Sequence, residues 1–169
     1  MKKLFILSMA AVIALTMTAC GMNVGGTSSG SGSSAASQAS KPTSDSYEDS
    51  LAGLEKYLAD NSVLSGNPSE MQAEFIGAKK GAKYQTSFNG NNNLTIELYE
   101  YDTASLNDTA KSVLDSVKKN GNLSIMNQQV SAELSDSGKY LMIYKDTSTA
   151  DQNKAHQKDV SALFKEFKK

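Results

Sequence analysis

The chain has 169 residues, with 17 basic and 18 acidic side chains, one His, one Cys, no Trp and two Pro. All the basic side chains are Lys, and the formal net charge is −1, which excludes the basic surface of a nucleic-acid-binding protein. One Cys cannot form an intrachain disulfide, and one Cys with one His cannot complete a Cys/His zinc site. We therefore expect no metal, no cofactor and no nucleic-acid partner.

The N-terminus has the parts of a secretory signal. Residues 1–3 are positively charged, residues 4–15 are apolar, and residues 16–19 are mostly small and lead to Cys20. The apolar run is shorter than the roughly 20 residues of a membrane-spanning helix, and no later run matches it. We therefore predict that residues 1–19 are a signal peptide and that the mature chain has no transmembrane helix.

The residues around the only cysteine are Met17-Thr18-Ala19-Cys20-Gly21. This sequence resembles the lipobox of bacterial lipoproteins, with Met17 where Leu is usual. The resemblance implies that a diacylglycerol is attached to the Cys20 thiol and that cleavage makes Cys20 the new N-terminus. Two or three acyl chains, at about 0.8 kcal/mol per buried methylene, anchor a protein stably. We expect a protein that is lipid-anchored at the extracytoplasmic face of the cell membrane.

Residues 20–45 contain the lipobox Cys20 and then a Ser/Gly-rich stretch, in which Val24 is the only β-branched apolar residue. Such a composition cannot form a core, so we predict a disordered linker. As a flexible chain it spans roughly 25 to 30 Å. Residues 46–169 then remain for a single globular domain.

The first half of this domain alternates between helical and strand patterns. The hydrophobic spacing and the turn signals predict, in chain order, a helix over 47–60 capped by Ser46, a short helix that opens at Asn67-Pro68 and stops at Gly77 or Gly81, a strand over 83–88, a turn over 89–93 and a strand over 94–101.

The second half repeats the order of strands followed by a helix. The patterns predict a helix that starts at Asp102 or Thr103 and ends at Gly121, a short strand over 123–126, an alternating strand over 130–134, a returning strand over 139–145, and a last helix capped by Thr149 and Gln152 with an apolar stripe of Val160, Leu163, Phe164 and Phe167.

These elements predict an α+β fold. We expect a mainly antiparallel sheet of four to five strands, built from two β-β-α units, with helices packed on it and an additional N-terminal helix. The segments 96–103 and 141–147 are alike, which suggests an internal repeat of architecture.

His156 is the only imidazole, and no phosphate-binding loop, Cys pair or nucleophile motif accompanies it. It is either a general base, or part of a metal site with Asp151 and Asn153, or an ordinary residue on the face of the last helix. We favour the last interpretation, because three ligands within so short a segment lack the carboxylate density of a calcium loop.

Three carboxylates gather near a strand end, at Glu97, Glu100 and Asp102. Glu100 and Asp102 would share a strand face at about 6.5 to 7 Å along the strand, a spacing that suits glycoside hydrolysis. Nothing nearby would desolvate them and raise a pKa, so we favour solvated charges and expect no enzyme.

The two faces of the predicted sheet differ in composition. We expect one face to pack against the two long helices, through Tyr84, Phe88, Leu94, Ile96, Leu98, Val130, Leu134, Leu141 and Ile143. The other face would carry Glu133 and the candidate binding surface, which comprises Glu97, Tyr99, Tyr101, Tyr140, Met142 and Tyr144. Two interpretations stay open: an aromatic recognition platform, or a face that the N-terminal helix covers.

The lipobox, the Ser/Gly linker and the small α+β domain together resemble the uncharacterised small lipoproteins of Gram-positive bacteria. The resemblance implies a membrane partner, through the lipid on Cys20. We expect a non-enzymatic binding or accessory module whose ligand is an envelope protein, a peptide or a glycan. The alternatives are a cell-wall glycan hydrolase that uses the strand-end carboxylates, and a reduced, single-lobe solute-capturing lipoprotein.

Overall fold

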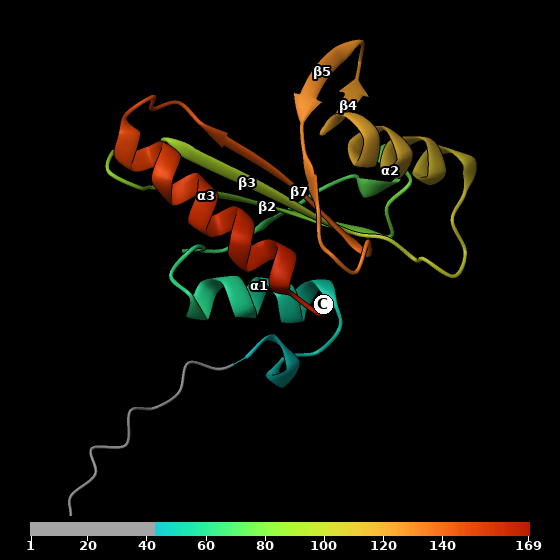
Figure 1. The fold of residues 1–169 in the computed structure, drawn as a ribbon, viewed down its shortest axis with the longest axis horizontal. Helices are drawn as coiled ribbons and strands as arrows, with labels where there is room; N and C mark the ends of the chain where they lie inside the picture. The colour runs from blue at the N-terminus through green and yellow to red at the C-terminus, as the bar shows by residue number, and fades with distance from the viewer. Residues whose placement is uncertain (1–42) are drawn as a thin grey trace, which may run out of the picture. The chain divides into compact units, whose positions relative to one another are not determined.

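The computed structural model describes residues 43–169, which form an α+β structure around an antiparallel sheet (Figure 1). The predicted fold class is confirmed. The signal peptide, the lipobox Cys20 and all but the end of the predicted linker lie outside the described residues. The elements, in chain order, are η1 (Ser44–Ser46), α1 (Leu51–Asp60), β1 (Ser69–Glu70), η2 (Ala73–Ile76), β2 (Lys80–Thr86), β3 (Leu94–Glu100), α2 (Asp108–Asn120), β4 (Asn122–Ile125), β5 (Gln128–Ser131), β6 (Glu133–Leu134), β7 (Tyr140–Asp146) and α3 (Asp151–Glu166).

The main sheet has five strands in the order β1-β2-β3-β7-β6, and β4 pairs with β5 in a separate two-stranded sheet. Hairpin β2–β3 is followed along the chain by α2, and hairpin β6–β7 is followed by α3, as the two β-β-α units predict. The central strands β3 and β7 pair along their whole length, with Leu98 opposite Met142 and Tyr99 opposite Leu141. Among the described residues, no helix is both long and apolar enough to cross a membrane.

The sheet is covered on both sides by different helices (Figure 1). One side, which we call the α1/α3 face, packs Ile96 and Leu98 with Leu54 of α1 and Phe164 of α3. The other side, the α2 face, packs against α2, η2 and the β4–β5 hairpin. The prediction that the two long helices share one face is therefore wrong.

The predictions for two elements near the N-terminus are also wrong, the first in its starting residue and the second in its type. Helix α1 begins at Leu51, because the side chain of Ser50 caps it by accepting a hydrogen bond from Gly53 N–H at 3.1 Å. Residues 69–70 form the edge strand β1 against β2 in place of a helix, and only the turn η2 follows. Gly81 belongs to β2, where a Cβ atom would come within 2.9 Å of the Tyr99 ring.

Helix α2 begins several residues after its predicted start, whereas α3 begins at Asp151, with Ala150 in place of Thr149 as its N-cap. Asn107 caps α2 by accepting from Ala110 N–H at 2.8 Å, and Gly121 ends it at a φ of +67°, as predicted. The predicted capping box of α3 does not form, because the Gln152 side chain instead accepts a hydrogen bond from Asn89 Nδ2 at 3.1 Å.

Candidate functional site

The predicted tyrosine-rich surface is divided between the two faces of the sheet. Side chains opposite each other in an antiparallel pair share a face, so the observed register places the residues of β3 and β7 in two sets. The α2 face carries Glu97, Tyr99 and Tyr101, whereas the α1/α3 face carries Glu133, Tyr140, Met142 and Tyr144. The prediction of a single aromatic platform is therefore wrong.

Most of these aromatic side chains are core residues. Tyr140 and Met142 are buried beneath α1 and α3, so the covered interpretation is correct for them. Tyr101 is buried on the α2 face, where its hydroxyl donates to Ile76 O at 3.2 Å. Burial raises the pKa of Tyr101 and the pKa of Tyr140 well above the ordinary value for tyrosine, so both hydroxyls stay protonated at neutral pH.

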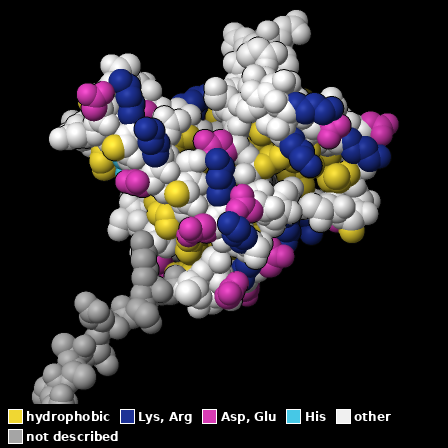
Figure 2. Space-filling model, viewed as in Figure 1, with side chains coloured by type: hydrophobic (Ala, Val, Ile, Leu, Met, Phe, Trp, Pro, Cys, Tyr) yellow, Lys and Arg dark blue, Asp and Glu magenta, His cyan; other side chains and the backbone are white. Residues whose placement is uncertain are grey.

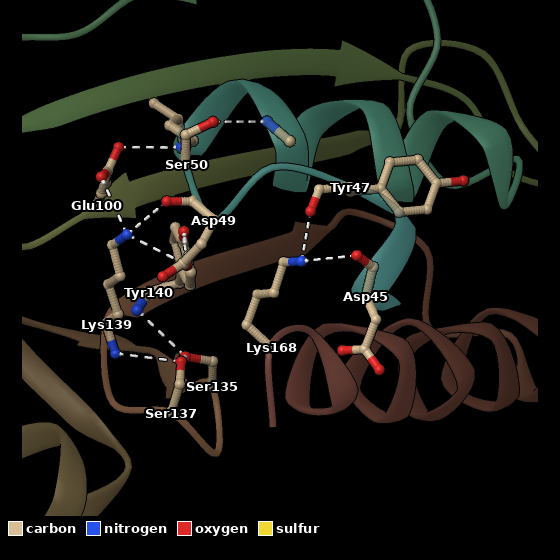
Figure 3. Close-up of polar contacts among 12 residues, drawn as sticks. Asp45, Tyr47, Asp49, Ser50, Glu100, Ser135, Ser137, Lys139, Tyr140 and Lys168 are labelled. Carbon is tan, nitrogen blue, oxygen red and sulfur yellow. Dashed lines mark hydrogen bonds and ion pairs between the residues drawn. The ribbon is translucent and has the colours of Figure 1, made fainter. Parts of the chain in front are cut away.

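Glu100 fastens the start of α1 to the sheet (Figure 3). Its Oε2 accepts a hydrogen bond from Leu51 N–H at 3.0 Å, and its Oε1 lies 3.5 Å from Lys139 Nζ. A carboxylate at a helix N-terminus satisfies backbone donors that would otherwise lack partners and complements the helix dipole. Glu100 is buried, so this contact has a structural role.

Asp49, the residue before the N-cap Ser50, also binds to the sheet at this point (Figure 3). The Tyr140 hydroxyl donates to Asp49 Oδ1 at 2.6 Å, and Lys139 Nζ lies 3.1 Å from the same oxygen. The hydrogen bond from Tyr140 lowers the pKa of Asp49 despite partial burial. Nearby, Lys168 donates to the Tyr47 carbonyl, so both ends of the domain are held against each other.

The three carboxylates predicted as an acid group have separate partners. Glu97 lies on the α2 face with Lys83 and Tyr99, while Glu100 lies on the opposite face with the α1 N-terminus. Asp102 is exposed beyond the strand and accepts from Ala104 N–H at 3.2 Å. The structure does not bring two of them together as a hydrolytic pair.

His156 lies on α3, as the favoured interpretation predicts. Its ring stacks on Phe88 with centroids 3.7 Å apart and planes 4° from parallel. Burial lowers the pKa of His156, and the nearby carboxylates of Asp159 and Asp146 only partly oppose this. Asn153 Nδ2 donates a hydrogen bond to Asp146 Oδ2 at 2.8 Å. The alternative prediction, a metal site formed by His156, Asp151 and Asn153, is therefore not supported. Within residues 43–169 no cluster of three or more His, Cys, Asp or Glu could hold a metal ion.

A cavity of about 370 Å³ lies over the α2 face, between η2 and the β4–β5 hairpin. Its apolar wall combines side chains from both flanking elements and from the segment before η2: Met71, Phe75, Ile76, Ile125, Met126 and Val130. Its polar groups are Gln72, Gln128, Glu97, Tyr99 and Lys145. This size and mixture are typical of a ligand site. Glu97 and Tyr99 are the two residues of the predicted surface that border it.

The rim of this cavity is unusually apolar for a surface. Phe75 is 76% exposed and Met126 is 92% exposed, and they are the two large hydrophobic side chains of residues 43–169 that are exposed to this extent. Both border this same cavity, on opposite flanking elements. Two exposed large apolar side chains beside one concave site indicate an interaction surface rather than ordinary scatter.

Met126 also has an uncommon backbone conformation. Ile125 and Gln128 are the last pair of the β4–β5 ladder, so Met126 and Asn127 form a two-residue turn. Their φ angles are +48° and +64°, and such turns favour Asn and Gly at these positions. Met at the first position is therefore disfavoured by the backbone, and its exposed side chain gains no compensating burial; backbone strain of this kind is typical of functional sites.

Glu97 is the buried charge at the floor of the cavity. It is only 7% exposed, and Tyr99 OH donates to its Oε2 at 3.1 Å. Its Oε1 has no hydrogen bond from residues 43–169 and has Lys83 Nζ at 3.7 Å as its ion-pair partner. Burial, followed by the Glu97 charge, raises the pKa of Tyr99, so this hydroxyl stays a donor. One carboxylate oxygen thus stays available to a ligand.

The sequence did not identify the other nine residues that line this cavity as site residues, among them Phe75, Met126 and Lys145. Only the Met-Asn turn was a readable signal, because a large apolar residue is unusual there.

Figure 2 shows the face that carries α1 and α3. On this face Lys side chains are interspersed with Asp and Glu side chains.

Comparisons of the chain with protein-family models, with curated proteins and with solved structures found no match.

Proposed function

We propose that this chain is a lipid-anchored, extracytoplasmic accessory module that binds an envelope protein through the cavity between η2 and the β4–β5 hairpin. One observation carries the binding role: Phe75 and Met126 are highly exposed, and both border the same cavity. Aromatic residues and Met are enriched at the cores of protein interfaces, and thioethers adapt to the shape of a partner.

The anchoring part of the proposal rests on the sequence. The signal pattern and the lipobox-like Met17-Thr18-Ala19-Cys20-Gly21 support lipid attachment at Cys20, and the Ser/Gly stretch after it supports a flexible tether. A tether of this kind keeps the domain close to membrane proteins and raises their effective concentration. A weak single site then suffices for binding.

The proposed role is binding without catalysis. Glu97, Glu100 and Asp102 have different partners, and His156 stacks on Phe88. Each polar group that catalysis would need is thus explained by packing, by a helix cap or by the cavity itself. The cavity supports recognition of a side chain by its apolar wall and of polar groups by Glu97 and Lys145.

The experiment is photo-crosslinking in intact cells with the full chain. A photoreactive amino acid replaces Phe75 or Met126 at the cavity, or Lys158 as the control, because Lys158 is exposed on α3 at the opposite face. We expect discrete protein adducts from positions 75 and 126 that are weak or absent from position 158. Equal adducts from all three positions, or none from the two cavity positions, contradict the proposed function.

A further inference from the structure

We propose that the occupant of this cavity is a peptide segment with a bulky apolar side chain next to an acidic one. This inference rests on the proposed function and specifies its ligand. The apolar side chain enters between Phe75 and Met126, a peptide N–H donates to Glu97 Oε1, and the acidic side chain pairs with Lys145.

The apolar position follows from the walls. Met71 and Phe75 lie on one side, and Ile125 and Met126 on the other, so a single large side chain contacts both flanking elements at once. The exposed thioether of Met126 adjusts to branched or aromatic side chains. Burial of such a side chain also removes Phe75 from water, which favours binding.

The donor position follows from Glu97. A carboxylate has about four acceptor positions, and Glu97 uses one for the Tyr99 hydroxyl and holds Lys83 at 3.7 Å. A buried acceptor with unused capacity favours a ligand that supplies a donor. The backbone N–H of a peptide is such a donor, whereas an acyl chain has none.

The acidic position follows from the charge balance on the α2 face. Lys83 and Glu97 are opposite each other in the β2–β3 ladder, and Lys145 is a diagonal neighbour of Glu97 on β7. Lys145 is exposed and makes no ion pair with any residue of 43–169. Among these three strand residues, two cations therefore accompany one carboxylate, and a ligand carboxylate supplies a partner for Lys145.

A glycan and a lipid each match only part of this site. A neutral glycan has donors and acceptors but no bulky apolar group and no charge for Lys145. A lipid acyl chain suits the apolar wall but supplies no hydrogen-bond donor to Glu97 Oε1 and no polar partner to Gln128. A peptide supplies all three groups within two neighbouring residues.

The experiment selects binders from a phage-displayed random peptide library on the purified full chain. We expect enrichment of an apolar residue followed or preceded by Asp or Glu. Retention of these peptides should fall about tenfold or more in Phe75→Ser/Met126→Ser and in Glu97→Gln. Lys145→Glu should reverse the preference, from acidic to basic neighbours of the apolar residue.

Matched controls separate binding from folding. Glu133→Gln changes a part-buried carboxylate on the opposite face, and Lys158→Glu reverses an exposed cation on α3, so neither should alter retention. Glu97→Gln keeps the side-chain shape and an acceptor for Tyr99, and its unfolding midpoint shows whether the variant is folded.

Three outcomes overturn the inference. They are the absence of enriched peptides, an enriched motif that Lys145→Glu leaves unchanged, and binding of phosphatidylglycerol vesicles that depends on Phe75 and Met126 and thereby assigns the site to lipid. If position 126 forms crosslinks in cells while the peptide preference is absent, the proposed function stands and only the ligand class is wrong. If both fail, the cavity is not a binding site.

Discussion

Met126 combines an exposed apolar side chain, which gains no burial energy on folding, with a left-handed backbone conformation, which costs stability. We predict that Met126→Asn raises the free energy of unfolding by about 0.5 to 1 kcal/mol, because Asn tolerates this conformation and little packing is lost. The same change should weaken partner binding. Urea unfolding and the crosslinking yield from position 75 measure the two effects. A variant that is less stable, or that forms adducts as well as the native chain, contradicts this explanation of Met126.

His156 makes the stability of the domain depend on pH. Because burial against Phe88 lowers the pKa of His156, the folded chain favours the neutral ring. The stabilisation is fully present above the unfolded pKa of about 6.5 and is lost as the pH falls through the folded pKa. We predict that urea midpoints measured from about pH 7.5 to pH 5 fall in the native chain, with a smaller fall in His156→Gln. Parallel curves for the two proteins would contradict this.

At the scale of elements, α1 depends on one buried carboxylate of the sheet. We predict that Glu100→Ala lowers the free energy of unfolding by about 2 to 3 kcal/mol, because Leu51 N–H and Lys139 lose their common partner. Glu100→Gln keeps an acceptor for Leu51 and should cost less. Hydrogen exchange locates the effect: amides of α1 should lose protection before those of α2. Uniform loss across both helices would show that Glu100 does not act through α1.

The same elements show how far the sequence determines the fold. The β2–β3 and β6–β7 hairpins and all three helices were predictable, because their apolar spacing and turn residues are local signals. The faces of β7 were not. The start of β7, Tyr-Leu-Met-Ile, is apolar and buried on both sides, so it lacks the alternation that would show which of its faces continues which face of β3. Only the register, with Leu98 opposite Met142, separates Tyr99 from Tyr140.

The candidate site was predictable only in part, for the same physical reason. Glu97 and Tyr99 were identified from their strand, and the cavity above them forms when η2 and the β4–β5 hairpin flank the sheet. The contact between these elements brings together residues from 71 to 145 of the chain, and no local pattern encodes it. Phe75 was expected on a short helix, and its exposure at the cavity rim followed only from the fold.

For the whole molecule, the two β-β-α units are alike in order but not equivalent in space. A two-fold axis perpendicular to the sheet would exchange β3 with β7 and would place both following helices on one face. In residues 43–169 these helices, α2 and α3, cover opposite faces. The similarity of segments 96–103 and 141–147 is therefore one of strand-to-helix chemistry, and the asymmetry leaves the α2 face with its cavity.

The anchoring hypothesis also belongs to the whole molecule. We predict that Cys20→Ser abolishes incorporation of a labelled fatty acid and leaves an unprocessed precursor. Lipid labelling is the suitable measurement, because an uncleaved signal alone could retain the chain at the membrane. Label in the variant equal to that in the native chain would contradict lipidation at Cys20, whereas the binding role of the cavity would be unaffected.

Recognition at the cavity on the α2 face can be tested directly, because the methionines provide probes for it. Met71 and Met126 border the cavity, while Met142 is buried on the α1/α3 face. We would record methyl NMR spectra of the methionine-labelled full chain during titration with the best-retained library peptide. If the peptide binds at this cavity, the signals of Met71 and Met126 should shift saturably while that of Met142 stays unchanged. Shifts of Met142 with Met71 and Met126 unmoved would contradict it.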